Sequence, residues 1–112
     1  MASHANPKLE HDIQNEIRLW CGEHDLLAFR VNTGSGYTPD GRRFSTGVPS
    51  GFPDVIVLTN NGKIIFVECK ARYGRVRPDQ ELLHRELRKR KFTVLVPKSL
   101  EQFIKEIEDE LL

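Results

Sequence analysis

The sequence lacks the features that define several other classes of protein. It has two cysteines, Cys21 and Cys69, which are too few for a disulfide framework, so a reducing, cytosolic location is expected. No apolar run approaches the roughly 20 residues that a membrane-spanning helix needs. Residues 1–11 are polar and contain no apolar signal region, so secretion is not expected. Gly-rich phosphate loops and nucleophile elbows are missing. Zinc-ligand spacing is also missing among the four histidines, which are His4, His11, His24 and His84.

Charge is unevenly distributed along a chain whose total is near zero. The 112 residues suit one domain spanning 1–112, and their net charge of +1 alone argues against a nucleic-acid partner. Residues 30–98 nevertheless carry +8, whereas residues 1–29 carry −3 and residues 99–112 carry −4. A basic block of this size is typical of a polyanion-binding surface, although a mixed, solvated surface would also produce it.

The spacing of apolar residues predicts an α/β domain. Apolar side chains recur every three or four positions from Leu9 to Trp20, which indicates an amphipathic helix over about 8–24. Residues 32–52 are rich in glycine and poor in apolar residues, so we expect a long loop without strands, of the kind that is often functional or mobile. The other expected elements are strands at 27–31, 55–58, 63–68 and 92–96 and helices at 78–90 and 99–111. Their order is α-β-β-β-α-β-α.

Two of these strands form a hairpin that brings acidic residues together. The turn Asn60-Asn61-Gly62 favours a hairpin because asparagine and glycine tolerate positive φ. Asp54 lies seven residues before Asn61 and Glu68 lies seven after it, so the two carboxylates should be cross-strand neighbours, about 5 Å apart. Lys70 is two residues beyond Glu68 and therefore shares its face.

A divalent cation would relieve the repulsion between these carboxylates. Apolar strands surround the pair and suggest partial burial, which makes two adjacent negative charges costly. Hard oxygen ligands suit Mg²⁺ or Mn²⁺, and the backbone carbonyl of Cys69 could supply a further oxygen. Lys70 could position a water or, as the neutral amine, deprotonate it, and its ammonium form could stabilise charge on a phosphate. A plain surface salt bridge is the alternative for a bare Glu-x-Lys, but the full pattern is much rarer.

These motifs resemble the VRR-NUC family within the PD-(D/E)XK nuclease superfamily. The resemblance rests on Gly51-Phe52-Pro53-Asp54, on Phe66-Val67-Glu68-Cys69-Lys70, and on Gln80 following Gly74-Arg75. It covers a core of about residues 9–103 and implies a restriction-endonuclease-like αβββαβ core with a mixed central sheet flanked by helices. Family members are metal-dependent nucleases. Stand-alone bacterial and phage versions resemble Holliday junction resolvases and tend to be homodimers, so branched DNA and a second copy are the implied partners, in the cytoplasm of a bacterial or phage-infected cell.

The resemblance also implies roles for individual residues. Asp54 and Glu68 would be metal ligands, Lys70 the catalytic lysine, and Gln80 a further active-site residue whose amide holds a water or a phosphate oxygen. The basic residues that follow would contact DNA phosphates. They are Arg72, Arg75 and Arg77 directly after the Glu-x-Lys strand, and Arg42 and Arg43 in the long loop.

The family carries one more acid on the first helix, and two residues compete for that place. At 100° per residue, Glu10 and Glu16 lie about 65° and 55° from the centre of the apolar face, so the geometry leaves both open. The family pattern places the acid three residues before the first helical isoleucine, which favours Glu10, before Ile13.

Other residues and surfaces are given plainer interpretations. The basic run at 85–91 is expected to be a solvated helix face. Pro39-Asp40 has no apolar strand after it and should be a loop only. The apolar stripe of the last helix is either a dimer surface or packs on its own sheet. The expected function is a metal-dependent endonuclease acting on branched DNA. The alternatives are a monomeric flap or nicking nuclease, and a non-catalytic DNA-binding module that retains the fold.

Overall fold

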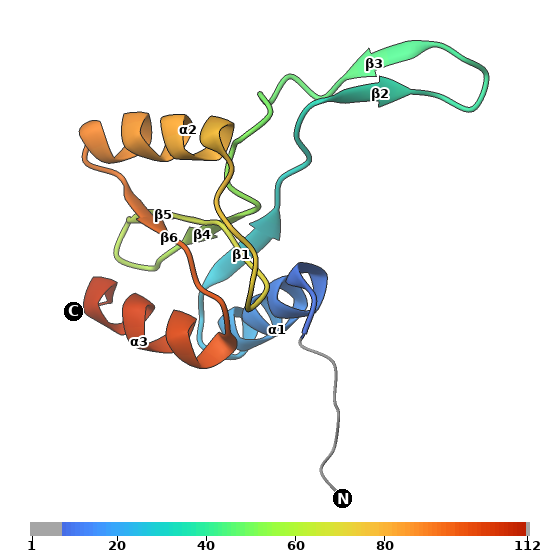
Figure 1. Ribbon diagram of the computed structural model, residues 1–112. Helices are drawn as coiled ribbons and strands as arrows, with labels where there is room; N and C mark the ends of the chain where they lie inside the picture. The colour runs from blue at the N-terminus through green and yellow to red at the C-terminus, as the bar shows by residue number, and fades with distance from the viewer. Residues whose placement is uncertain (1–7, 112) are drawn as a thin grey trace, which may run out of the picture.

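Four short strands make the central sheet of the computed structural model, which describes residues 8–111 (Figure 1). The strand order is β1-β4-β5-β6. The elements of this core are α1 (Glu10–Glu23), β1 (Leu27–Arg30), β4 (Val55–Leu58), β5 (Ile64–Val67), α2 (Pro78–Lys89), β6 (Thr93–Leu95) and α3 (Leu100–Glu110). The α/β fold with a mixed sheet is therefore confirmed. His4 and most of the polar N-terminal segment, residues 1–11, lie outside the described residues.

The predicted hairpin is the centre of the sheet. β4 and β5 pair antiparallel, with Val55 opposite Val67 and Ile56 opposite Phe66. The turn between them places Gly62 at a φ of 85°, which glycine adopts without steric cost. β1 pairs antiparallel with β4, whereas β6 pairs parallel with β5 after a crossover through α2. The strands begin and end within a residue or so of the expected positions.

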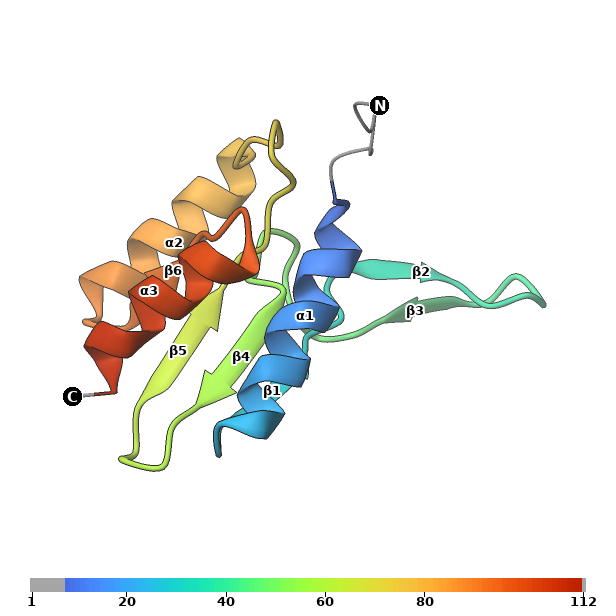
Figure 2. The same cartoon turned by 90° about the horizontal axis from the view of Figure 1, so that it is seen from below.

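Helices cover both faces of the sheet (Figures 1 and 2). α1 and α3 lie on one face, where alternate strand residues join the helices in the main hydrophobic core. The side chains of Phe103 and Ile107 on α3 are fully buried in that core. The apolar stripe of the last helix therefore packs on its own sheet and leaves those residues unavailable to a dimer partner. α2 lies on the opposite face, where Phe66 meets the rings of Phe52 and Phe92 edge-on at 5.5 Å.

The segment expected to be a strand-free loop contains a second, two-stranded sheet. β2 (Ser35–Tyr37) and β3 (Arg43–Ser45) pair with each other and project from the body as an arm (Figures 1 and 2). We call residues 32–49 the β-arm. The expectation of a strand-free loop was wrong, because these two strands are stabilised by pairing with each other and not by burial in the core. The ring of Phe44 also covers Gly36, where a Cβ atom would lie only 3.0 Å from Cζ of that ring. Between residues 8 and 111, no helix is long and apolar enough to cross a bilayer.

Candidate active site

The candidate site lies where β4 begins and β5 ends. The pair Val55 and Val67 extends by one residue to place Asp54 opposite Glu68, as the hairpin spacing predicts. The Asp54 side-chain Oδ2 accepts a hydrogen bond of 2.9 Å from the Cys69 backbone N–H, and its backbone carbonyl accepts one of 2.8 Å from Val31. These two bonds hold Asp54 between the ends of β5 and β1.

Glu68 is a buried carboxylate with one oxygen in use. The residue is 1% exposed, and its Oε1 lies 3.3 Å from Nε2 of His84 on α2. The other oxygen, Oε2, is buried and has no hydrogen-bond partner. Leaving a buried polar atom unpaired costs about 1–3 kcal/mol, so a ligand bound at this oxygen would relieve that cost.

Burial raises the proton affinity of both carboxyl groups, and the neighbouring Glu68 raises that of Asp54 further. The pKa of Asp54 is raised to about 7, mainly because the carboxyl is partly buried and secondly because Glu68 lies beside it. Burial also raises the pKa of Glu68, although the neighbouring Asp54 carboxyl and the charge of Lys70 oppose that effect. Two carboxyls that resist ionising together form a site that a cation would stabilise.

Lys70 supplies the positive charge beside this pair. It is 3% exposed, and its backbone N–H donates to the Pro97 carbonyl at 3.1 Å. Its Nζ lies 3.8 Å from Oε1 of Glu10, at the start of α1. Glu16 instead pairs with Lys8. The structure thus brings Glu10 to the cluster and leaves Glu16 outside it.

The start of α2 closes one side of the site. Gln80 is 4% exposed, and its side-chain oxygen accepts a 2.9 Å hydrogen bond from the Arg77 backbone N–H, which caps the helix. The amide nitrogen of Gln80 remains as the end that could donate to a ligand. Gly51, with a φ of 93°, lies so close to this turn that a Cβ atom would sit 2.7 Å from the Asp79 carbonyl oxygen.

The donor set fits a cation that completes its coordination with water or substrate. Among residues 8–111, no group of three or more His, Cys, Asp or Glu side chains is gathered closely enough to hold a metal ion. Asp54 and Glu68 offer two carboxylates, one with a free buried oxygen, and Mg²⁺ commonly uses one or two carboxylates with waters and substrate phosphates. The Cys69 thiol is fully buried and burial raises its pKa, so it stays protonated and is a poor ligand.

The predicted DNA-binding arginines form two groups. Arg72, Arg75 and Arg77 lie on the exposed segment between β5 and α2, where Arg77 pairs with Asp79 at 3.2 Å. Its contact with Asp79 is the main cause that raises the pKa of Arg77, and the charges of Glu68 and Glu10 add to that effect. The second group, Arg42 and Arg43, lies on the β-arm. Asp40 pairs with Arg42 at 3.1 Å in the turn between β2 and β3, so it belongs to a loop, as expected.

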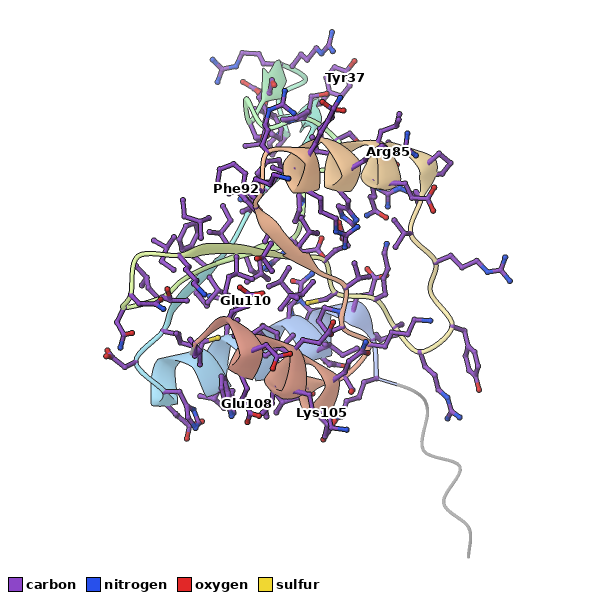
Figure 3. The ribbon with its side chains drawn as sticks, turned by 90° about the vertical axis from the view of Figure 1, so that its left-hand side faces the viewer. Tyr37, Arg85, Phe92, Lys105, Glu108 and Glu110 are labelled. Atoms are coloured by element: carbon purple, nitrogen blue, oxygen red, sulfur yellow. The ribbon has the colours of Figure 1, made fainter. Side chains whose placement is uncertain are left out.

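Sequence reasoning missed the contact of His84 with Glu68. In the sequence His84 looks like the other three histidines, but it is 3% exposed and lies one helical turn after Gln80, on the same face of α2. That spacing is the signal that could have found it. His84 also borders a groove of about 730 Å³ along α2. Arg85 lies on the outer side of the helix (Figure 3), and Arg88 donates to the Val94 carbonyl at 2.9 Å.

A mixed sheet flanked by helices, with two carboxylates and a lysine at one end, defines a PD-(D/E)XK-like α/β core. Residues 10–100 match the model of the VRR-NUC domain, and the chain therefore belongs to this family of nuclease domains. A solved structure described as a "VRR_NUC domain" is 29% identical, with a TM-score of 0.67, over 88% of this chain and 94% of its own. A second, described as a "VRR_NUC domain protein", is 18% identical, with a TM-score of 0.63, over 92% of this chain and 88% of its own, and supports the fold alone. Curated proteins gave no significant match.

Proposed function

We propose that this domain is a Mg²⁺- or Mn²⁺-dependent endonuclease that hydrolyses phosphodiester bonds in DNA. The observation that carries the proposal is the pair of the buried Glu68, with one unpartnered carboxylate oxygen, and the half-buried Asp54, beside the Lys70 ammonium. A module that only bound DNA would gain nothing from two repelling carboxyls in an apolar setting. That cost argues for a catalytic role over the binding-module alternative.

The residues around the pair have distinct tasks in this proposal. Asp54, Glu68 and the Cys69 carbonyl would hold the ion, which when bound neutralises charge at the phosphate and makes a water more acidic. Lys70 is shielded from solvent, so its ammonium would stabilise negative charge on the phosphate strongly or position the attacking water. Glu10 holds that ammonium in place from α1.

Neighbouring polar groups would position the substrate. The free amide end of Gln80 would donate to a water or a phosphate oxygen while its carbonyl fixes the start of α2. Arg72, Arg75 and Arg77 would hold phosphates that flank the scissile bond. Because these contacts read the backbone, they favour DNA structure over DNA sequence.

The proposed substrate is branched DNA and the proposed assembly is a homodimer. One chain carries one Asp54–Glu68 pair, so cutting two strands symmetrically requires two copies related by a two-fold axis. A cleavage panel of four-way junction, flap, splayed and linear duplex DNA, with sedimentation to give the oligomeric state, tests both points. A monomer that cuts flaps and leaves junctions intact would establish the flap-nuclease alternative.

Substitutions at the site test the catalytic assignment. Glu68→Gln and Lys70→Met should each lower the cleavage rate by at least about 100-fold, the scale typical of lost acid–base or charge stabilisation. Matched controls are Glu108→Gln and Lys105→Met on the exposed side of α3 (Figure 3), which should cleave like wild type. Undiminished cleavage by either site variant would contradict the proposal.

The two acids of α1 give an internal comparison. Glu10→Gln removes the partner of Lys70 and should slow cleavage by about 10-fold, the lower end of what an orienting contact contributes. Glu16→Gln removes only the exposed pair with Lys8 and should leave the rate unchanged. The reverse result would show that Glu16 is the helix acid of the site.

A further inference from the structure

A carboxylate that binds a metal must present the correct oxygen, and Glu68 is held in a way that selects one. Its Oε1 is engaged by Nε2 of His84 at 3.3 Å, whereas its Oε2 is buried without a partner. Both residues are almost inaccessible to solvent, at 1% for Glu68 and 3% for His84. Water therefore cannot easily replace the histidine contact or satisfy the second oxygen.

We infer that His84 is a positioning residue, which fixes the rotation of the Glu68 carboxylate so that Oε2 is presented to the bound cation. The inference rests on the proposed function, because it concerns how the proposed metal ligand is oriented. An ionised carboxylate only accepts hydrogen bonds, so Nε2 of His84 must carry the hydrogen that it shares with Oε1. Partners of this kind orient metal ligands in many proteins, and removing them weakens metal binding.

The fold explains why His84 can perform this task with little freedom. α2 begins at Pro78 and is capped by the Gln80 side chain, one turn before His84 on the same helix face. Gly51 lies directly against that first turn, and the Ser50 hydroxyl donates to Asp79 at 3.1 Å. The chain leading into Asp54 is therefore packed on the helix that carries His84. The packing of residues 50–54 against α2 therefore sets the positions of both the Asp54 and the Glu68 carboxylates.

A merely structural histidine and a positioning histidine give different results when the donor is replaced. His84→Met fills the space without donating to Glu68. His84→Gln restores an N–H at a reach similar to that of Nε2. Leu87→Ala, on the same helix and half-buried, disturbs packing without altering any polar group near Glu68. Glu68→Gln removes the proposed ligand itself.

The experiment measures Mn²⁺ binding to the full chain by isothermal titration calorimetry, without DNA. His84→Met should weaken binding about 10- to 100-fold, and His84→Gln should recover most of the loss. Leu87→Ala should lower the thermal midpoint and leave the affinity unchanged. Binding by His84→Met equal to wild type, with Glu68→Gln unable to bind, would overturn the inference and leave the proposed metal site intact. A wild-type chain that binds no Mn²⁺ would overturn both.

A second measurement does not depend on any variant folding. Nitrogen-15 NMR of the wild-type imidazole reports which ring nitrogen carries the hydrogen. We expect a protonated Nε2 in the Mg²⁺-loaded protein, since that atom faces Oε1. A hydrogen on Nδ1 alone, with Nε2 bare, would overturn the assignment.

Discussion

At the scale of single residues, the acidic pair destabilises the fold that holds it. Asp54 and Glu68 stand side by side among apolar strands, and burial raises the pKa of both. Without a cation, each step toward ionising both groups opposes folding. The proposed metal binding would offset this loss of stability.

Neutralising one of the two acids should stabilise the metal-free protein. The folded-state pKa of Asp54, about 7, lies above its ordinary value of 3.8, so wild-type stability should fall as pH rises from about 4 to 7. Asp54→Asn removes that loss and still accepts from Cys69. We expect the variant to be about 1–3 kcal/mol more stable at pH 8 in EDTA, with little difference at pH 4. Urea denaturation checks this, and an Asp54→Asn variant less stable than wild type at pH 8 would refute it.

Prediction of residue positions from the sequence succeeded where the pairing register of a hairpin fixes which residues are neighbours. The hairpin turn and the two-residue repeat of a strand placed Asp54, Glu68 and Lys70 together without further information. Helical periodicity could not choose between Glu10 and Glu16, because both lie at a similar angle from the apolar face. The choice depends on how α1 is rotated and shifted on the sheet, which is set by packing across the whole core.

At the scale of elements, the contact between Gly51 and the first turn of α2 links the two halves of the site. Gly51 combines a φ of 93° with backbone atoms of Asp79 where a side chain would be. Gly62, in the β4–β5 turn, has a similar φ of 85° but open space around it. The two glycines separate backbone strain from steric contact.

This pair gives a matched prediction for stability. Gly62→Ala should cost about 1 kcal/mol, from the strain of a left-handed backbone alone. Gly51→Ala should cost that amount plus about 1–3 kcal/mol more, because the loop and α2 must move apart. Urea unfolding of both variants measures the difference, and equal losses would show that the Gly51 contact carries no steric constraint.

Most elements were predictable because burial leaves a period in the sequence. The helices α1, α2 and α3 show that period, whereas β4 and β5 were recognisable as uninterrupted apolar runs, which are typical of strands buried on both faces. β2 and β3 left no such signal, since each has three residues, one includes Gly36, and their partner is another exposed strand. A ribbon stabilised by its own pairing and by Phe44 over Gly36 cannot be recognised from burial.

At the scale of the whole molecule, the β-arm is anchored at the candidate site. It leaves the sheet after Arg30, which pairs with Val55, and the chain returns directly into Asp54. At its base, Gly34 donates to the Val48 carbonyl at 2.9 Å. A two-stranded ribbon of this kind fits a DNA groove, and its arginines would meet phosphates some distance from the scissile bond.

Removing the charge of the arm should weaken DNA binding without affecting the fold. In the double variant Arg42→Ala, Arg43→Ala, the log–log slope of binding against salt should flatten by up to about 2, because each phosphate that the protein neutralises adds about 0.9 to it. A control double variant, Arg18→Ala with Lys105→Ala, removes exposed charge from α1 and α3 and should change the slope little. Fluorescence anisotropy over a range of salt concentrations measures both. Equal slopes for the arm variant and wild type would mean that the arm does not touch the DNA backbone.

The closed base of the β-arm has a consequence for how such a protein can diversify. A segment whose ends are held together, and whose strands pair only with each other, can be lengthened, shortened or exchanged while the sheet beneath it stays the same. Under the proposed function, the chemistry at Asp54 and Glu68 and the DNA contacts of the β-arm would thus be carried by parts that can change independently. Replacing the β-arm with that of a relative would be a route to a new substrate preference while the sheet and the candidate active site stay unchanged.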